Sequence, residues 1–303
     1  MPNLAQTLSS TISQTLQGKG SAIELAITAL FAGGHLLIED HPGVGKTLLA
    51  RSLARALDLP FQRVQCTADL LPADILGGQV YDPRTGQLGF QQGPVFTSVL
   101  LADELNRTPP RTQSALLECM AERSVTIGRT TYPLPDPFFV IATQNPDDAA
   151  GTYPLPESQL DRFLLRIHLG YPAPEYEATI LRTEDGHRQA TQSKPIASPQ
   201  DLIAARAQVD AVRCANELVE LIVQLANRTR QLPDVRVGVS TRGAQALHRA
   251  CRARAVVQGR DYVVPDDIRS LLAPAWSHRL QLHGSGDATA VLDELLAATK
   301  LPD

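Results

Sequence analysis

Residues 40–47 read Asp-His-Pro-Gly-Val-Gly-Lys-Thr, and this stretch constrains the fold more than any other part of the chain. It follows a short apolar run at 35–38, and it precedes a segment whose apolar positions 49, 53, 56 and 57 share one helical face. A strand, a glycine-containing loop, Lys-Thr and a helix are the sequence pattern of a phosphate-binding loop. In such a loop backbone N–H groups surround phosphate oxygens, Lys46 would reach the β/γ-phosphates, and Thr47 would bind Mg²⁺.

One position departs from the strict motif, which has glycine where this chain has Asp40. A carboxylate there would repel phosphate if it pointed into the loop. The alternative is a chance Gly-Lys-Thr in an ordinary strand-to-helix turn. Motifs elsewhere in the chain are therefore needed to distinguish a phosphate-binding loop from a chance match.

The bulk composition is that of an ordinary globular protein whose 303 residues allow two domains. The net charge of −4 does not indicate binding to nucleic acid or to an anionic membrane, although residues 228–279 carry ten Arg, no Lys and four Asp. No long apolar stretch or signal-peptide pattern is present, so we expect no membrane insertion and a cytoplasmic location. Four cysteines without metal-like spacing are expected to be buried thiols in a reducing compartment: Cys66, Cys119, Cys214 and Cys251.

Two patterns divide the chain near residue 170. Before it, five apolar or alternating runs predict strands that alternate with helices, at 35–38, 61–66, 97–102, 138–143 and 163–169. This order predicts a doubly wound α/β domain over 1–170, with hairpin-like insertions near 77–96 and 124–131. After it, helical patterns predict a helical domain over 171–303, at 174–185, 199–207, 215–230, 241–257, 265–273 and 288–298.

Polar residues follow two of the predicted buried strands. Asp103 and Glu104 end the third strand, at the edge of a parallel sheet where ligands bind. Asp103 is placed to hold Mg²⁺ or its water, and Glu104 to polarise an attacking water; the alternative is a pair of acids that solvate a strand end. Asn145 follows the fourth strand and could position water or touch the γ-phosphate, although Asn is also common in turns. Spacing alone assigns no role to Arg162 or Arg242, which could be ordinary surface arginines.

Several motifs together resemble one family. The segments that carry the resemblance are 35–50, Leu-Ala-Asp-Glu-Leu-Asn-Arg at 101–107, Thr-Gln-Ser-Ala-Leu-Leu-Glu at 112–118, Ala-Thr-Gln-Asn-Pro at 142–146, Gly-Thr-Tyr-Pro-Leu-Pro-Glu at 151–157, Leu-Asp-Arg-Phe at 160–163, Ser-Thr-Arg-Gly at 240–243 and Gly-Arg-Asp-Tyr-Val-Val-Pro at 259–265. Over about residues 18–282 the chain resembles the MoxR group of AAA+ ATPases.

The resemblance implies an AAA+ P-loop core with a parallel five-stranded sheet in the order 5-1-4-3-2, followed by an all-α lid domain. It implies an insert in helix 2 within 77–96 and a hairpin at 124–131 before sensor 1. Nucleotide would contact Pro42, Gly43, Val44, Gly45, Lys46, Thr47 and Leu48. Asn145 resembles sensor 1, Arg162 the arginine finger and Arg242 sensor 2, while Arg107 or Arg111 could share the finger role.

The same resemblance implies what the protein does. ATP would lie between core and lid and the finger would act on a neighbouring subunit's ATP, so a ring is implied, usually a hexamer. The expected function is an ATP-hydrolysing motor or chaperone that remodels or assembles client proteins, with a partner bearing a von Willebrand factor A domain. The alternatives are a ring ATPase that acts on nucleic acid and a nucleotide switch without turnover. An aspartate in place of the motif glycine also occurs in this group, which implies that Asp40 points away from phosphate. Many relatives have Gly-Gln where this chain has Gly18-Lys19.

Overall fold

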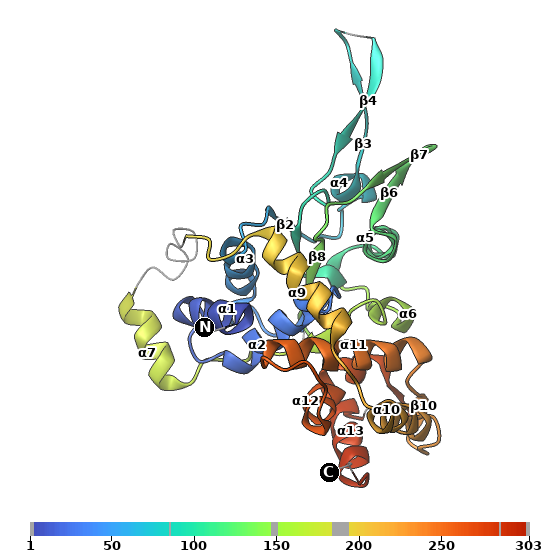
Figure 1. Cartoon of the computed structure of the whole chain (residues 1–303). Helices are drawn as coiled ribbons and strands as arrows, with labels where there is room; N and C mark the ends of the chain where they lie inside the picture. Colours follow the sequence, from blue (N-terminus) through green and yellow to red (C-terminus); the bar gives the residue numbers. More distant parts are fainter. Residues whose placement is uncertain (1–2, 85, 147–150, 184–193, 285, 301–303) are drawn as a thin grey trace.

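A sheet of five parallel strands lies at the centre of the fold (Figure 1). The structure, a computed structural model, describes residues 3–84, 86–146, 151–183, 194–284 and 286–300. The strands of the sheet are β1 (Leu36–Glu39), β2 (Phe61–Gln65), β5 (Val99–Asp103), β8 (Phe139–Gln144) and β9 (Leu165–Ile167). Their spatial order, β2-β5-β8-β1-β9, is the 5-1-4-3-2 order counted from the other edge, so the predicted topology is confirmed.

Successive side chains of each strand point to opposite faces of the sheet, and each face packs against its own apolar cluster. Leu36 and Ile38 of β1 pack in one apolar cluster with the helices α1 (Leu4–Thr15), α2 (Gly20–Phe31) and α3 (Lys46–Ala56). Leu37 packs in a second cluster with α5 (Pro110–Glu122). This two-sided burial explains why β5 and β8 are nearly continuous apolar runs. Two shorter helical elements complete this part, η1 (Leu105–Arg107) and α6 (Glu157–Leu160).

Two antiparallel hairpins project from one end of the core (Figure 1). They are β3 (Gly77–Asp82) with β4 (Gln87–Gln92), and β6 (Ser124–Ile127) with β7 (Thr130–Pro133); the short helix α4 (Pro72–Leu76) precedes the first. The rings of Phe90 and Tyr132 stack with centroids 4.2 Å apart, which joins the two hairpins near their bases. Val80, Tyr81 and Leu88 are exposed on the longer hairpin. The two predicted insertions are therefore hairpins.

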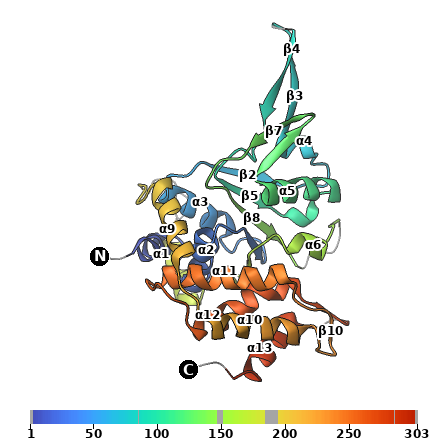
Figure 2. The same cartoon turned by 45° about the vertical axis from the view of Figure 1, so that its right-hand side comes forward.

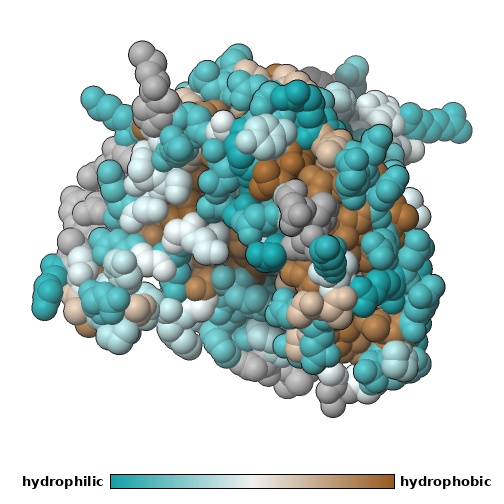
Figure 3. Space-filling model, turned by 60° about the horizontal axis from the view of Figure 1, so that its bottom comes forward, coloured by the Kyte–Doolittle hydropathy of each residue, from teal (hydrophilic) through white to brown (hydrophobic). Residues whose placement is uncertain are grey.

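The C-terminal part forms a helical lid against the core (Figure 2). Its elements are α7 (Pro174–Thr183), α9 (Pro199–Ala211), α10 (Asn216–Thr229), α11 (Thr241–Val257), α12 (Pro265–Trp276), η2 (Ser277–Arg279) and α13 (Ala288–Ala297). Each predicted helix is present, although the last two residues of the one expected at 174–185 lie outside the described residues. Seen from the lid side, the surface alternates between hydrophobic and hydrophilic patches (Figure 3).

The lid also contains a small sheet that the sequence did not predict. Strands β10 (Val235–Val237) and β11 (Gln281–Leu282) pair antiparallel, so the expectation of an all-α lid needs this correction. Runs of two and three residues are too short to show the alternation by which a strand is recognised. The pairing becomes possible only when the helices bring these distant segments together.

Core and lid share one continuous apolar cluster, to which α1, α2 and the lid helices α10 to α13 all contribute. Polar contacts reinforce the junction: Arg249 Nε of α11 donates to the Ala32 carbonyl (2.9 Å), and Asn3 Nδ2 donates to the Val257 carbonyl (3.2 Å). The N-terminal helix is therefore packed in place, with Leu8 and Ile12 fully buried. In the described part of the chain no helix combines the length and the apolar character needed to cross a membrane.

The four cysteines are free thiols, three of them buried and Cys214 half-buried. Burial raises the pKa of the Cys66 thiol to about 11 and that of Cys119 to about 12. Since the thiolate is the reactive form, these thiols are structural. The prediction that the cysteines are packing residues is confirmed for these positions.

His35, just before β1, gives the fold a specific dependence on pH. The ring is buried; Nδ1 accepts the N–H of Val140 (3.0 Å), so Nε2 carries the proton and donates to the Met120 carbonyl (3.2 Å). Burial lowers the pKa of His35 to about 4. On acidification the His35 ring takes up a second proton in the unfolded chain at a higher pH than in the folded protein. We therefore expect this group to lower the free energy of unfolding by about 2 kcal/mol between pH 7.5 and 5.

Urea unfolding of the wild type and of His35→Gln at these two pH values tests this expectation. Glutamine keeps a donor and an acceptor but does not titrate, so the variant should lose about 2 kcal/mol less than the wild type on acidification. His278, whose pKa burial also lowers, is present in both proteins and cancels. Equal losses in the two proteins would contradict the account.

Candidate functional site

The phosphate-binding loop connects β1 to α3, as the sequence predicts. Gly43 and Gly45 have φ values of 84° and 102°, in the left-handed region that glycine adopts without steric cost. These two turns bring the loop round to the N-terminus of α3, whose first residue is Lys46. The free N–H groups and the dipole at a helix N-terminus favour a phosphate group there.

Lys46 supplies the positive charge of this loop. Its Nζ donates to the backbone carbonyl of Asp40 at 2.6 Å. Burial lowers the pKa of Lys46, while the carboxylates of Asp103, Asp40 and Glu104 act in the opposite direction. The ammonium group is thus held beside the loop by a neutral carbonyl, which an anionic phosphate can replace.

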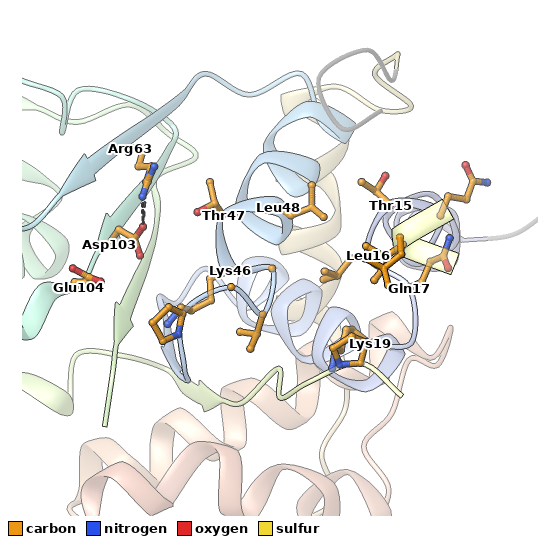
Figure 4. Close-up of a pocket in the computed structure, with 18 of the residues that line it drawn as sticks. Thr15, Leu16, Gln17, Lys19, Lys46, Thr47, Leu48, Arg63, Asp103 and Glu104 are labelled. Carbon is orange, nitrogen blue, oxygen red and sulfur yellow. Dashed lines mark hydrogen bonds and ion pairs between the residues drawn. The ribbon is translucent and has the colours of Figure 1, made fainter. Parts of the chain in front are cut away.

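A cavity of about 820 Å³ lies over the loop, and Figure 4 shows the side chains around it. Its walls come from four parts of the chain. Three belong to the core: the loop and start of α3 at 42–48, the strands β2 and β5 with Arg63, Gln65, Asp103 and Glu104, and the N-terminal segment 14–17 with Lys19. The fourth is formed by Pro172 and by Ile180 and Leu181 of α7. Its volume lies in the range of pockets that bind small molecules and cofactors.

The two predicted acids lie at the carboxyl edge of the sheet, on this cavity. Asp103 Oδ1 accepts the hydroxyl of Thr143 (2.6 Å), and Asp103 Oδ2 accepts Nη2 and Nε of Arg63 (2.7 and 3.1 Å). Glu104 has a left-handed φ of 59°, unusual for a residue with a side chain, and its N–H donates to the same Thr143 hydroxyl (2.8 Å). The local backbone is thus fixed with both carboxylates at the cavity.

Two residues of β2 that the sequence analysis missed neighbour these acids. Arg63 pairs with Asp103, and Gln65 Nε2 donates to Glu104 Oε2 at 3.0 Å. The sequence does contain a signal that these two side chains lie side by side: Arg63 and Gln65 alternate with Val64 and so share one face of the strand. Only the β2–β5 register, in which Gln65 is paired with Asp103, shows that they reach the acids.

The donor set on the cavity fits a Mg²⁺ ion. Thr47 and Asp103 present hydroxyl and carboxylate oxygens, the hard ligands that Mg²⁺ prefers. Within the described ranges no group of three or more His, Cys, Asp and Glu side chains could hold a metal. A protein site of this kind suits an ion that keeps waters and takes its remaining ligands from phosphates.

Asn145 lies at the same edge of the sheet, one residue beyond β8, where Gln144 is paired with Glu39. It is buried, and its carbonyl accepts Asn106 Nδ2 at 3.4 Å. It is near the loop in topology but does not belong to the cavity wall described above. Its predicted role as sensor 1 stays a prediction.

Arg162 and Arg242 lie together near the amino ends of the parallel strands, whereas the phosphate-binding loop lies at their carboxyl ends. Arg162 precedes β9 and therefore lies beyond the amino end of the parallel strands, whereas the loop follows the carboxyl end of β1. A second cavity of about 380 Å³, between core and lid, is lined by both arginines. The structure thus places Arg242 beside Arg162, and not beside the loop of its own chain.

Arg279 of the lid, another residue that the sequence analysis missed, fixes the segment before Arg162. Its side chain is 4% exposed, and Nε donates to Asp161 Oδ1 at 2.6 Å. Nη2 donates to the Phe163 carbonyl at 2.6 Å, and burial lowers the pKa of Arg279 while Asp161 acts to raise it. Asp161 also lies 3.9 Å from Arg242 Nε. No sequence signal marks Arg279, because an arginine after a helix is typical of a solvated helix end.

The other two arginines that could share the finger role differ from Arg162. Arg107 Nε lies 3.3 Å from Glu104 Oε2 of its own chain. Arg111 is exposed near the start of α5. Both follow the carboxyl end of β5, on the side of the molecule that carries the acids.

The sheet order, the phosphate-binding loop after β1 and the helical lid define the AAA+ class of P-loop proteins. Residues 35–165 match the family described as "ATPase family associated with various cellular activities (AAA)", and residues 227–295 match the AAA lid domain. The Bacillus subtilis protein YeaC is 43% identical over 296 residues, which cover 96% of this chain and 92% of YeaC. Chaperone MoxR1 of Mycobacterium tuberculosis is 38% identical over 297 residues, covering 94% of this chain and 78% of MoxR1.

A solved structure of a Cytophaga hutchinsonii protein is similar throughout, with a TM-score of 0.87 and 36% identity over 99% of this chain and 97% of that one. Proteins named MoxR from Methylorubrum extorquens and Paracoccus denitrificans are 33% and 32% identical. The chain therefore belongs to the MoxR family of AAA+ ATPases, and the predicted family is confirmed.

Proposed function

We propose that this protein hydrolyses ATP with Mg²⁺ at the cavity over the phosphate-binding loop. The observation that carries the proposal is that Lys46, Thr47, Asp103 and Glu104 line one cavity of about 820 Å³. A phosphate-binding group, metal ligands and a carboxylate able to polarise water are the parts that nucleotide hydrolysis needs. A nucleotide switch without turnover would not need Glu104.

Each part has a role that follows from its position. The backbone of 42–48 binds the phosphates, and Lys46 exchanges the Asp40 carbonyl for phosphate oxygens. Thr47 and Asp103 would hold Mg²⁺, which offsets the negative charge of the phosphates when bound. Glu104 accepts a proton from the attacking water, and Asn145 orients that water or the γ-phosphate. For Asp103 to serve the metal, Arg63 has to release one carboxylate oxygen.

The positions of Arg162 and Arg242 support a ring in which each active site is composite. Both arginines lie beyond the amino end of the strands, so a head-to-tail contact would present them to the loop of a neighbouring copy. Repetition of such a contact closes a ring when the rotation between neighbours completes a full turn, and a hexamer is the expected size. In this arrangement Arg162 acts as the arginine finger and Arg242 as a second contact to the same γ-phosphate.

We further propose that the ring remodels or assembles client proteins with a partner that carries a von Willebrand factor A domain. The core, 1–170, would hydrolyse ATP and the lid, 171–303, would move with the cycle. The exposed Val80, Tyr81 and Leu88 on the longer hairpin support a client-binding surface. Affinity purification from the native cell that recovers no protein of this partner class would contradict the proposed partner.

The arginine-rich lid segment gives little support to a nucleic-acid motor. Arg254 and Arg260 both donate to the fully buried Asp267, at 2.9 and 2.7 Å. Arg279 is buried against the core, and Arg249 pairs with Asp210. These side chains hold the lid together, and this accounts for much of the positive charge without phosphate contacts.

Replacing Lys46 by alanine tests the proposed site. We expect at least a 100-fold loss of affinity for ATP, since the variant lacks the one lysine on the loop and its charge-assisted bonds to phosphate. Titration with a fluorescent ATP analogue measures the loss, and the exposed Lys194→Ala is the matched control. Unchanged affinity in Lys46→Ala would contradict ATP binding at this loop.

A further inference from the structure

Asp40 stands where the strict phosphate-binding motif has glycine, and the structure shows where its side chain goes. The residue is buried, 6% exposed. Its Oδ2 accepts the N–H groups of Leu169 (2.5 Å) and Gly170 (2.7 Å), and its Oδ1 accepts the N–H of His41 (3.1 Å). The carboxylate therefore points away from the phosphate site and toward the chain that leaves the sheet after β9.

The side chain of Asp40 continues the strand pairing where the backbone no longer can. Strands β1 and β9 are paired in parallel up to Ile38↔Ile167, and β1 ends one residue later, at Glu39, where the chain enters the phosphate-binding loop. Two successive N–H groups beyond β9 then need an acceptor other than the β1 backbone. Asp40 supplies it for both, and a glycine at this position would leave them without it.

A second side chain binds the same residue, Gly170, through its carbonyl. Lys19 is buried, and its Nζ donates to the Gly170 carbonyl at 2.8 Å. Gly170 has a φ of 64°, so the chain reverses there in a conformation that suits glycine. The N–H and C=O of Gly170 are thus bound by residues from two separate segments of the core. This assigns a role to Lys19, which stands where many relatives have glutamine.

The segment held in this way forms one wall of the nucleotide cavity. Directly after Gly170, the ring of Tyr171 stacks on His41 with centroids 5.9 Å apart. Pro172 then lines the cavity, together with Ile180 and Leu181 of α7, the first helix of the lid. Figure 4 shows Lys19 beside this segment, on the far side of the loop from the acids.

Asp40 also contacts the phosphate-binding lysine, because Lys46 Nζ donates to its backbone carbonyl (2.6 Å). Three hydrogen bonds therefore connect Lys46 to Asp40, Asp40 to Gly170, and Gly170 to Lys19. When Lys46 turns to a phosphate, the peptide of Asp40 loses its cation while the carboxylate keeps its hold on Gly170. These hydrogen bonds connect Lys46, which would bind phosphate, to the segment after β9 that forms one wall of the cavity.

We propose that Asp40 is a positioning residue that, together with Lys19, couples nucleotide occupancy of the loop to the position of segment 170–181. This inference rests on the proposed function, because it describes how the same site communicates with the lid. It predicts that loss of the hydrogen bonds from Asp40 and Lys19 to Gly170 lowers ATP turnover more than nucleotide binding. If Asp40 were only a tolerated replacement of glycine, its removal would change neither turnover nor binding.

Asp40→Gly, which restores the strict motif, is the sharpest variant. We expect its KM for ATP to stay within about threefold of the wild type and its kcat to fall at least tenfold, because a misplaced wall affects the reacting geometry more than phosphate binding. Asp40→Asn keeps an acceptor oxygen and should recover most of the lost kcat. Equal kcat in Asp40→Gly and the wild type would overturn the proposal.

Hydrogen exchange of the amides of residues 169–171, two of which donate to Asp40, measures these hydrogen bonds directly and needs no turnover. Without nucleotide, these amides should exchange at least tenfold faster in Asp40→Gly and in Lys19→Met than in the wild type. Addition of ADP should change exchange across 169–181 in the wild type and leave it nearly unchanged in both variants. An unchanged 169–181 profile in the wild type would overturn the coupling, even if neither variant folds.

The two measurements also separate this inference from the proposed function. A wild type that binds nucleotide without releasing phosphate would contradict the proposed hydrolysis, and the exchange data with ADP would still test the coupling. A wild type that hydrolyses ATP, with amide exchange at 169–171 that is the same in all three proteins, would contradict the coupling alone.

Discussion

Replacing Arg162 by alanine is expected to lower ATP turnover by about 10³- to 10⁵-fold and to leave nucleotide affinity within a few-fold of the wild type. Arg162 lies beyond the amino end of the sheet, across the strands from the loop that would bind ATP. Its Nη1 donates to the Leu117 carbonyl (2.9 Å), and it lines the cavity that Arg242 shares. Because Arg162 lies across the sheet from the loop of its own chain, the proposed finger role requires a nucleotide held by another copy.

The measurement is phosphate release at saturating ATP, together with a titration of nucleotide binding. Arg213→Ala is the matched control, because Arg213 is an exposed arginine paired with Asp261 on the lid surface. Arg162→Lys keeps the charge but loses the planar fork, so it should recover only a small part of the rate. Turnover near that of the wild type in Arg162→Ala would contradict the finger assignment, and Arg107 and Arg111 would then be examined.

Glu104→Gln is expected to lower hydrolysis by about 10²- to 10⁴-fold while ATP still binds, because glutamine fills the same space but cannot accept the proton of water. The site supports this distinction, since the left-handed backbone of Glu104 is held by Thr143. Gln65 and Arg107 contact its carboxylate, and an amide there keeps the first of these contacts possible.

The checks for Glu104→Gln are phosphate release and the retention of labelled ATP after gel filtration. ATP should remain intact on the protein for many wild-type turnover times. The exposed Glu118→Gln on α5 is the control and should behave as the wild type does. Rapid hydrolysis by Glu104→Gln would show that another group activates the water.

The sheet could be predicted from the sequence because its signals are local. The runs at β5 and β8 are nearly continuously apolar, as expected for strands buried on both faces, and turn residues separate them from helices. The strand order came from the resemblance and not from the patterns. Strands β10 and β11 gave no signal, since their pairing depends on how the lid helices dock.

The acid side of the site could also be predicted, because residues that follow parallel strands meet at one edge of the sheet. The same rule separates Arg162, which precedes a strand, from Lys46 and Asp103. The neighbour of Arg242 could not be found in this way, because it depends on the docking of the lid through Arg279 and Asp161. The direction of the Asp40 side chain required the β1–β9 register.

Mixing two inactive variants tests the composite site most directly. Lys46→Ala subunits would bind no ATP but still carry Arg162, and Arg162→Ala subunits would bind ATP but lack the finger. In a randomly mixed ring with equal amounts of each, roughly a quarter of the interfaces join an intact loop to an intact finger. The account predicts that the mixture regains roughly that fraction of wild-type turnover. A mixture that stays as inactive as its two components at every ratio would contradict it.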